Sequence, residues 1–139
     1  IHPDVNLGDL VVAMGASTDS NMNRARFAGL DFAAIADYRM LESWVDVAEI
    51  RGVNFSVANV LTSDTFYQLN NDVYDIASRF GIVAVEMEVA ALYRVAAEHG
   101  GKALGVMTVS DHISKNERLS AEERETNFVE MIETTLASL

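Results

Sequence analysis

Three carboxylates follow shortly after apolar runs in the second half of the chain, where they could carry out acid chemistry. Glu86 and Glu88 come behind the run 82–85, and Asp111 comes behind the run 103–109. A carboxyl group that burial or crowding keeps protonated near neutral pH is able to donate a proton. The alternative is that the two glutamates are first-turn acids of a helix, favoured by its dipole, and that the aspartate caps a loop. Spacing alone leaves both explanations open.

A strand–helix–strand unit has to position these carboxylates. The run 82–85 predicts a buried strand, and the run 103–109 predicts a second one. Between them, apolar residues recur at helical spacing until Gly100–Gly101, which end the predicted helix. The predicted buried face of this helix holds Val89, Leu92, Val95 and Ala96. If the two strands are parallel, their carboxyl ends share one edge of the sheet, where open α/β sheets bind ligands.

The rest of the chain alternates between predicted strands and helices. Strands are expected at 10–14 and 53–61, a loop at 112–119, and helices at 37–50, at 71–80 and from 120 onwards. Asp37 and Ser120 are of a residue type that caps helices, and Glu123 completes a capping-box spacing with Ser120. The strand–helix order predicts a mostly parallel, three-layer α/β domain.

Composition excludes several classes of function. The chain has 139 residues, half of them hydrophobic and one of them proline, as expected of one globular domain. A net charge of −11 without a basic stripe argues against a nucleic-acid partner. The chain has no cysteine for a disulfide or a cysteine-based metal site, and no apolar run that would span a membrane. His2 and His99 have no partner at metal-ligand spacing, so we expect no metal.

The segment VAVEMEVAALYRVAAEHGGKALGVMTVSDHI resembles the hexameric, bacterial-type purine nucleoside phosphorylases of the nucleoside phosphorylase superfamily. The combination of VEME, a helix and TVSDH is the most specific part of the resemblance. The similarity continues through GDLVVAMGASTDS, NRARFAGLDFAAIADY, SDTFY and AEERETNFVEMI, and so covers nearly the whole chain. It implies a nucleoside phosphorylase-like, three-layer α/β/α fold with a mixed, mostly parallel sheet, and a cytoplasmic enzyme of purine salvage.

The resemblance also implies a catalytic pair. Phosphorolysis breaks the N-glycosidic bond while phosphate attacks the sugar, and a proton donor at N7 relieves the negative charge on the departing purine. Asp111 matches the family's proton donor, and Arg124 matches the arginine that assists the transfer. Arg124 stands in the first turn of the last predicted helix, where the dipole disfavours a cation, so we expect it to have a partner elsewhere. The histidine after Asp111, His112, is expected to be structural.

Further residues match the family's substrate contacts. Glu86, Met87 and Glu88 match the ribose-binding segment, and Glu88 is the stronger candidate for binding the sugar hydroxyls. The other implied substrate contacts are Phe66 against the base, Ser110 beside it, and Val85. The family needs no cofactor, since phosphate is a co-substrate. Tyr67, next to Phe66, is expected to be a core residue.

The part of the family that precedes the matched region is not in this sequence. It contains the first strands, the glycine and arginine segments that hold phosphate, and a histidine lent by a neighbouring subunit. We therefore expect residues 1–139 to be the C-terminal part of a single phosphorylase domain, completed by a segment that is cleaved, unseen or supplied by a companion chain. The chain begins with Ile and carries no signal-peptide pattern. The resemblance implies a homo-hexamer built as a trimer of dimers.

Three alternatives stay open. The chain could be a non-catalytic module that binds nucleosides or serves assembly after losing its phosphate site. It could be a uridine phosphorylase, but those carry a Gln and an Arg after SDTFY, and the stretch 68–72 has no arginine. It could be a nucleosidase of the adenosylhomocysteine type, which shares a VEME-like segment and an S-D pair. The arginine of AEER belongs to the phosphorylases and favours the purine nucleoside phosphorylase over the nucleosidase.

Overall fold

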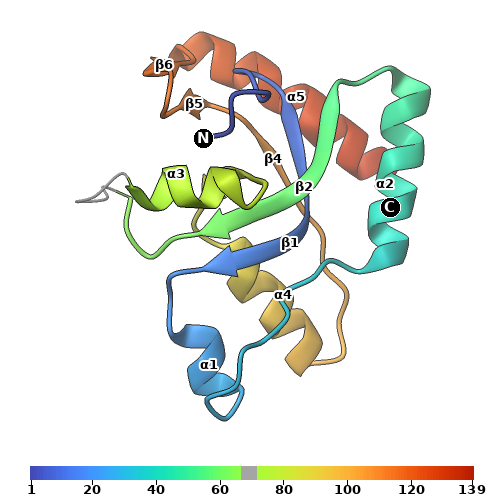
Figure 1. Ribbon diagram of the computed structural model, residues 1–139. Coiled ribbons are helices and arrows are strands. Elements are labelled where there is room, and N and C mark those ends of the chain that lie inside the picture. The colour runs from blue at the N-terminus through green and yellow to red at the C-terminus, as the bar shows by residue number, and fades with distance from the viewer. Residues whose placement is uncertain (67–71) are drawn as a thin grey trace.

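A computed structural model describes residues 1–66 and 72–139, apart from the side chains of Thr126 and Asn127. Tyr67, the stretch 68–71 and thus the first residue of the helix expected at 71–80 lie outside the described residues. Figure 1 shows the arrangement of the elements. In chain order they are β1 (Leu10–Thr18), α1 (Met22–Arg26), α2 (Tyr38–Arg51), β2 (Phe55–Thr62), α3 (Asp72–Arg79), β3 (Ile82–Glu86), α4 (Val89–Glu98), β4 (Gly105–Thr108), β5 (Asp111–His112), β6 (Glu117–Arg118) and α5 (Ala121–Ala137).

The main sheet is mixed and mostly parallel, as predicted. Its strand order is β3-β2-β1-β4. β1, β2 and β3 run parallel to one another, and β4 runs antiparallel to β1. β5 and β6 form a separate two-stranded hairpin within the segment predicted to be a loop. In the part of the chain that the model describes, no helix is both long enough and apolar enough to cross a membrane.

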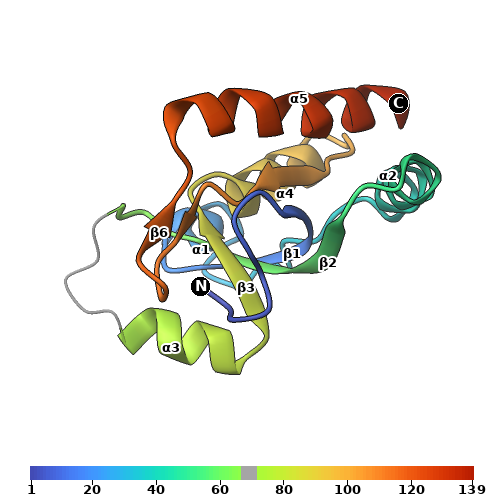
Figure 2. The same cartoon turned by 90° about the horizontal axis from the view of Figure 1, so that it is seen from above.

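Helices cover both faces of the sheet, which gives the predicted three layers. Alternate residues of β1 point to opposite faces, so Val11 and Ala13 pack towards α4, whereas Leu10 and Val12 pack with Trp44 of α2. α5 lies beside α2 and also packs on β4. α3 packs against the end of the sheet at β3, and Figure 2 shows α3 and α5 on opposite sides of the strands.

Local signals set the ends of the long helices where the sequence predicts them. The Asp37 carboxylate accepts a hydrogen bond from the Met40 N–H at 3.0 Å and begins α2. Gly52 ends that helix with φ of 68°, a left-handed conformation that favours glycine. Ser120 and Glu123 form the predicted capping box at the start of α5.

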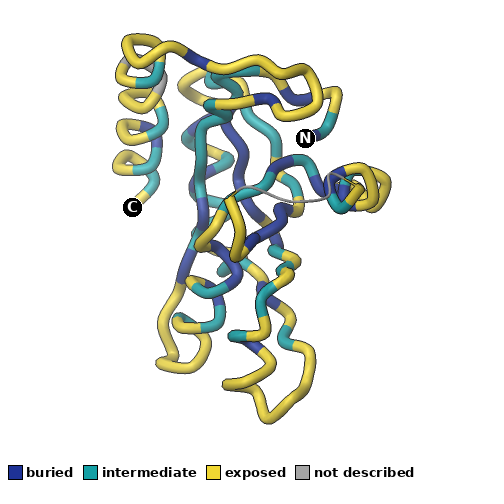
Figure 3. Tube along the Cα trace, turned by 90° about the vertical axis from the view of Figure 1, so that its left-hand side faces the viewer, coloured by how far each residue is buried: buried dark blue, intermediate teal, exposed yellow. Residues whose placement is uncertain are grey.

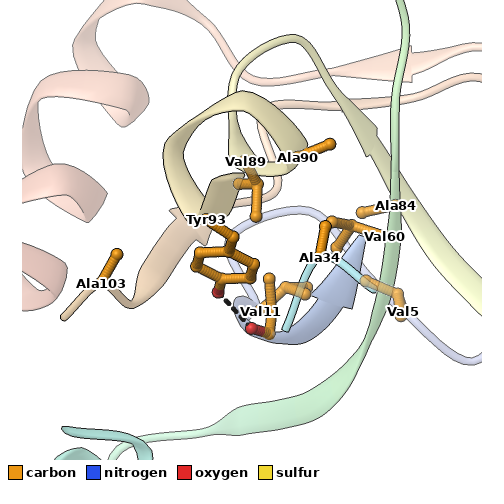
Figure 4. Close-up of a cluster of buried hydrophobic side chains, with 10 residues drawn as sticks. Val5, Val11, Ala34, Val60, Ala84, Val89, Ala90, Tyr93 and Ala103 are labelled. Carbon is orange, nitrogen blue, oxygen red and sulfur yellow. Dashed lines mark hydrogen bonds between the residues drawn. The ribbon is translucent and has the colours of Figure 1, made fainter. Parts of the chain in front are cut away.

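The buried face of α4 agrees only in part with the predicted one, since Val89 and Ala96 pack on the core as predicted but the other two residues do not. Val89, Ala90 and Tyr93 are buried, whereas Leu92 and Val95 are 43% and 42% exposed. In the burial view of Figure 3, buried positions lie mainly along the central strands and exposed positions mainly on the outer helices and loops. Helical spacing identified an apolar stripe, but a phenol hydroxyl decides which side faces the sheet. Tyr93 donates a hydrogen bond to the Ala13 carbonyl (Figure 4). It also accepts one from the Gly105 N–H at 2.9 Å.

Candidate functional site

One cavity of about 590 Å³ is lined by most of the predicted site residues, although Arg124 is not among the residues that line it. This volume is in the range of pockets that enclose a small organic ligand. The walls come from the loop after β2, the end of β3, the end of β4 and the N-terminal segment. Among the lining residues are all of the predicted substrate contacts and the predicted proton donor: Phe66, Val85, Glu86, Met87, Glu88, Ser110 and Asp111.

The route by which Asp111 reaches this cavity differs from the predicted one. The condition that the strands before Glu86 and Ser110 run parallel is not met, because β4 pairs antiparallel with β1 and places Thr108 opposite Leu10. The N-terminal segment instead connects the start of β3 with the end of β4. The His2 N–H donates to the Val83 carbonyl at 3.2 Å, and Gly8 and Asp9 exchange hydrogen bonds of 2.9 Å with Val109. Ile1 and Val5 of this segment line the cavity between β3 and β4.

Asp111 is held between a hydroxyl and a guanidinium. The Ser110 hydroxyl donates to its Oδ2 at 2.7 Å. Nη2 of Arg124 lies 3.2 Å from Oδ2 and 3.4 Å from Oδ1. This is the partner expected for a cation in the first turn of α5. Both side chains of the ion pair are partly exposed, so water screens the interaction and leaves the carboxylate accessible.

The two glutamates of the VEME segment have different surroundings. Oε2 of Glu86 accepts hydrogen bonds from the N–H groups of Glu88 and Val89, each at 2.7 Å. Oε1 accepts a hydrogen bond from the Thr62 hydroxyl. The Glu86 carboxylate thus binds the start of α4, which agrees with the helix-acid explanation of its position.

Glu88 is exposed and lines the cavity. Its carboxylate accepts a long hydrogen bond, 3.3 Å, from the N–H of the neighbouring Met87. Glu88 is also the N-cap residue of α4, yet its side chain does not bind the helix end. A carboxylate with this much free accepting capacity is suited to bind hydroxyl groups of a ligand.

The loop after β2 contributes an aromatic ring to the cavity. Phe66 lines the cavity and is 71% exposed, so its ring is accessible to a ligand. Asp19 ties this loop to the end of β1, because it accepts from the Ser63 hydroxyl at 2.7 Å and from the Asp64 N–H at 2.8 Å. The ring of a flat, apolar-faced ligand such as a purine would find a suitable contact here.

His112 has a structural environment. It is buried, the Lys115 N–H donates to its Nδ1 at 3.2 Å, and its Nε2 lies 3.1 Å from the His2 carbonyl oxygen. With Nδ1 accepting, Nε2 carries the hydrogen and donates it to that carbonyl. The ring therefore links the β5–β6 hairpin to the N-terminal segment. Within residues 1–66 and 72–139, no group of three or more acidic or histidine side chains is arranged to hold a metal ion.

Comparison with known proteins identifies the family of the chain. Over residues 1–139 the chain matches the family described as Phosphorylase superfamily. The chain belongs to the phosphorylase superfamily. It is 50% identical over all 139 residues to a protein named "Purine nucleoside phosphorylase DeoD-type" from Colwellia psychrerythraea, of which it covers 59%. Proteins of the same name from Photorhabdus laumondii and Shewanella loihica are each 49% identical, over 100% and 98% of this chain and 58% of their own length.

The chain thus spans less than three fifths of the length of these superfamily relatives.

Two residues that support the cavity were not singled out from the sequence. Thr62 binds Glu86 and the Ala90 N–H, and Asp19 holds the Phe66 loop. Each stands at the end of a parallel strand, so the rule that placed Glu86 at such an end would have included them.

Proposed function

We propose that this chain carries the nucleoside-binding half of a purine nucleoside phosphorylase site. The reaction is the reversible phosphorolysis of purine ribo- and deoxyribonucleosides to the free base and ribose or deoxyribose 1-phosphate. The observation that carries the proposal is the placement of the Asp111–Arg124 pair, the carboxylate of Glu88 and the ring of Phe66 around one cavity. The names of the relatives support purines as the substrate class.

In this proposal Asp111 acts as the general acid. It gives a proton to N7 of the purine as the glycosidic bond breaks, which neutralises the charge that develops on the leaving base. Once the proton has left, Arg124 stabilises the resulting carboxylate, because its guanidinium is already within 3.2 Å. The Ser110 hydroxyl fixes the orientation of the carboxyl group through its hydrogen bond to Oδ2.

The sugar and the base occupy different walls of the cavity. Glu88 accepts hydrogen bonds from the 2′- and 3′-hydroxyls, and its charge favours the positive character of the ribose in the transition state. Met87 and Val85 give apolar contacts, and Phe66 packs against a face of the base. Neither a metal nor an organic cofactor takes part in this scheme.

Phosphate is bound by residues outside this chain. Among residues 1–66 and 72–139, no lysine or arginine lines the cavity. The start of α4, which would suit an anion, already binds Glu86 and Thr62. We therefore place the phosphate site in a segment that precedes residues 1–139 or in a neighbouring subunit. On this view, residues 1–139 are the C-terminal part of a single phosphorylase domain, and the complete protein is a cytoplasmic hexamer.

A phosphate-dependence assay on the natural polypeptide that contains this chain tests the proposal. With inosine, we expect hypoxanthine and ribose 1-phosphate in equal amounts, and no turnover when phosphate is left out. Release of hypoxanthine without phosphate would indicate a nucleosidase, and a preference for uridine would indicate a uridine phosphorylase. Binding of inosine without any turnover would indicate a non-catalytic module. Light scattering on the same sample tests the hexamer.

A further inference from the structure

The backbone N–H groups at the start of α4 donate hydrogen bonds to two side chains, one at the end of β2 and one at the end of β3. The N–H groups of Glu88 and Val89 donate to Glu86, and the N–H of Ala90 donates to the Thr62 hydroxyl at 2.9 Å. The Thr62 hydroxyl in turn donates to Oε1 of Glu86. Three donors that a helix leaves free at its N-terminus are therefore satisfied from β2 and β3.

The part of this hydrogen-bond network around the Thr62 hydroxyl is buried. Thr62 and Ala90 have no exposed surface, and Val89 is 5% exposed. A hydroxyl in such a position donates one hydrogen bond and accepts another, so removal of its oxygen leaves two polar groups without a partner. β2 and β3 are adjacent parallel strands, with Thr62 opposite Glu86, so the sheet itself fixes the distance between the two side chains.

The same network explains why Glu88 does not cap its own helix. An N-cap side chain ordinarily binds the N–H groups of the first turn. Glu88 holds the N-cap position of α4 without such a bond, because Glu86 and Thr62 already accept from those groups. Its carboxylate is left to face the cavity.

We propose that Thr62, acting with Glu86, is a positioning residue that keeps the Glu88 carboxylate available to the sugar of the substrate. The inference rests on the proposed function, in which Glu88 binds the ribose hydroxyls. It changes the role of Glu86 from a ligand of the sugar to the residue that holds the helix start. Thr62 touches no substrate, and its effect passes through Glu86 and the backbone of residues 88–90.

The test compares Thr62→Val with Thr62→Ser in the natural, phosphorolytically active polypeptide. Valine keeps the shape and removes the oxygen, whereas serine keeps the oxygen. The readout is the ratio of kcat/KM for inosine to kcat/KM for 2′-deoxyinosine. The amount of active enzyme cancels in this ratio, so a variant that merely folds less well leaves it unchanged. We expect Thr62→Val to lower the ratio about tenfold, since misplacement of a substrate-binding group has effects of that order. We expect Thr62→Ser to restore it.

A matched control is Thr134→Val. Thr134 is fully buried in α5, and its hydroxyl has no hydrogen-bond partner among the described residues. This variant therefore removes a buried hydroxyl away from the network and should leave the substrate ratio unchanged. In a Glu88→Ala background, Thr62→Val should have no further effect on the ratio. An unchanged ratio in Thr62→Val, or an equal additional drop in the Glu88→Ala background, overturns the proposal.

Hydrogen exchange separates failure of this inference from failure of the proposed function. If the natural polypeptide does not turn over inosine, the proposed function fails, and amide exchange then decides about the network. Thr62→Val should speed exchange at the Ala90 amide, with Thr62→Ser close to the wild type. Unchanged exchange at Ala90 would show that the hydroxyl does not hold the helix start.

Discussion

Nη2 of Arg124 lies 3.2 Å from Oδ2 of Asp111, although the two residues belong to different elements and are 13 positions apart. The hairpin β5–β6 begins at Asp111, and the capping box at Ser120 begins the helix that carries Arg124. Two independent local structures thus set the geometry of one ion pair. The pair joins an acid that faces the cavity to a cation that can stabilise its charged form.

The first prediction concerns the proton that Asp111 donates. Asp111→Asn keeps the shape of the side chain and removes the transferable proton. General acid catalysis contributes about two to four powers of ten in rate, so kcat for inosine should fall by that much. KM should change little, because the bound nucleoside gains little from the proton. Steady-state kinetics with saturating phosphate measure both quantities.

A substrate with an alkylated N7 is the control for this variant. Its purine carries a positive charge and leaves without protonation, so Asp111→Asn should hardly slow 7-methylinosine. An equal loss with both substrates would show that Asp111 positions the nucleoside and that the acid is another group.

The second prediction concerns the coupling of Arg124 to this acid. Arg124→Ala should lower kcat for inosine in the same direction as Asp111→Asn. The double variant should lose less than the sum of the two free energies, because residues that act as one unit are not additive. A double-mutant cycle built from the four kcat values checks this. Full additivity would mean that the ion pair has no role in the chemical step.

The third prediction concerns the aromatic contact. Phe66→Ala should raise KM for inosine about tenfold, which corresponds to the contribution of one aromatic contact, and should leave the thermal midpoint almost unchanged because the ring is 71% exposed. Phe80→Ala is the matched control, since Phe80 is 80% exposed and does not line the cavity. Similar KM values for the two variants would remove Phe66 from the binding site.

The fourth prediction concerns stability and the buried hydroxyl of Tyr93. Tyr93→Phe leaves the Ala13 carbonyl and the Gly105 N–H without their partner, which should cost about 1–3 kcal/mol of the free energy of unfolding. Tyr38→Phe is the control, because the Tyr38 hydroxyl binds Glu42 at the surface, and it should cost little. Chemical denaturation of both variants and the wild type measures the difference.

The same residue predicts a dependence on alkaline pH. Burial raises the pKa of Tyr93 above its ordinary value of 10.0. The neutral phenol is thus favoured in the folded state, and its contribution to stability is complete below pH 10.0 and is lost as the pH rises through the folded pKa. Denaturation above pH 10 should therefore show a smaller loss of stability with pH in Tyr93→Phe than in the wild type. Parallel pH profiles would contradict this assignment.

The fifth prediction concerns the chain of residues 1–139 alone. Because no lysine or arginine lines the cavity in the described part of the chain, we expect it to bind inosine weakly and to show negligible phosphorolysis. An assay with inosine and phosphate on a sample whose mass is verified as the single chain checks this. Turnover by that sample would place the phosphate site within these residues.

The sequence by itself determined the features that depend on neighbours along the chain. The Asp37 cap and the Ser120–Glu123 box each involve residues that are a few positions apart, and the structure has both. The family resemblance likewise rests on short motifs, and several of the residues that it named, among them Phe66, Glu88 and Asp111, line the cavity. Local hydrogen bonding and residue type suffice for such predictions, because no distant segment competes for these groups.

Only the tertiary structure decided the relations between distant segments. An apolar run such as 103–109 predicts a strand but does not predict its direction. β4 pairs antiparallel with β1, on the side of β1 away from β2. The side of α4 that is buried depends on where the Tyr93 hydroxyl finds its two partners, 80 and 12 residues away. The difference between Glu86 and Glu88 arises in the same way. Both are glutamates beside Met87, but Thr62 reaches Glu86 from the adjacent strand, and a contact across 24 residues of sequence leaves no trace in local spacing.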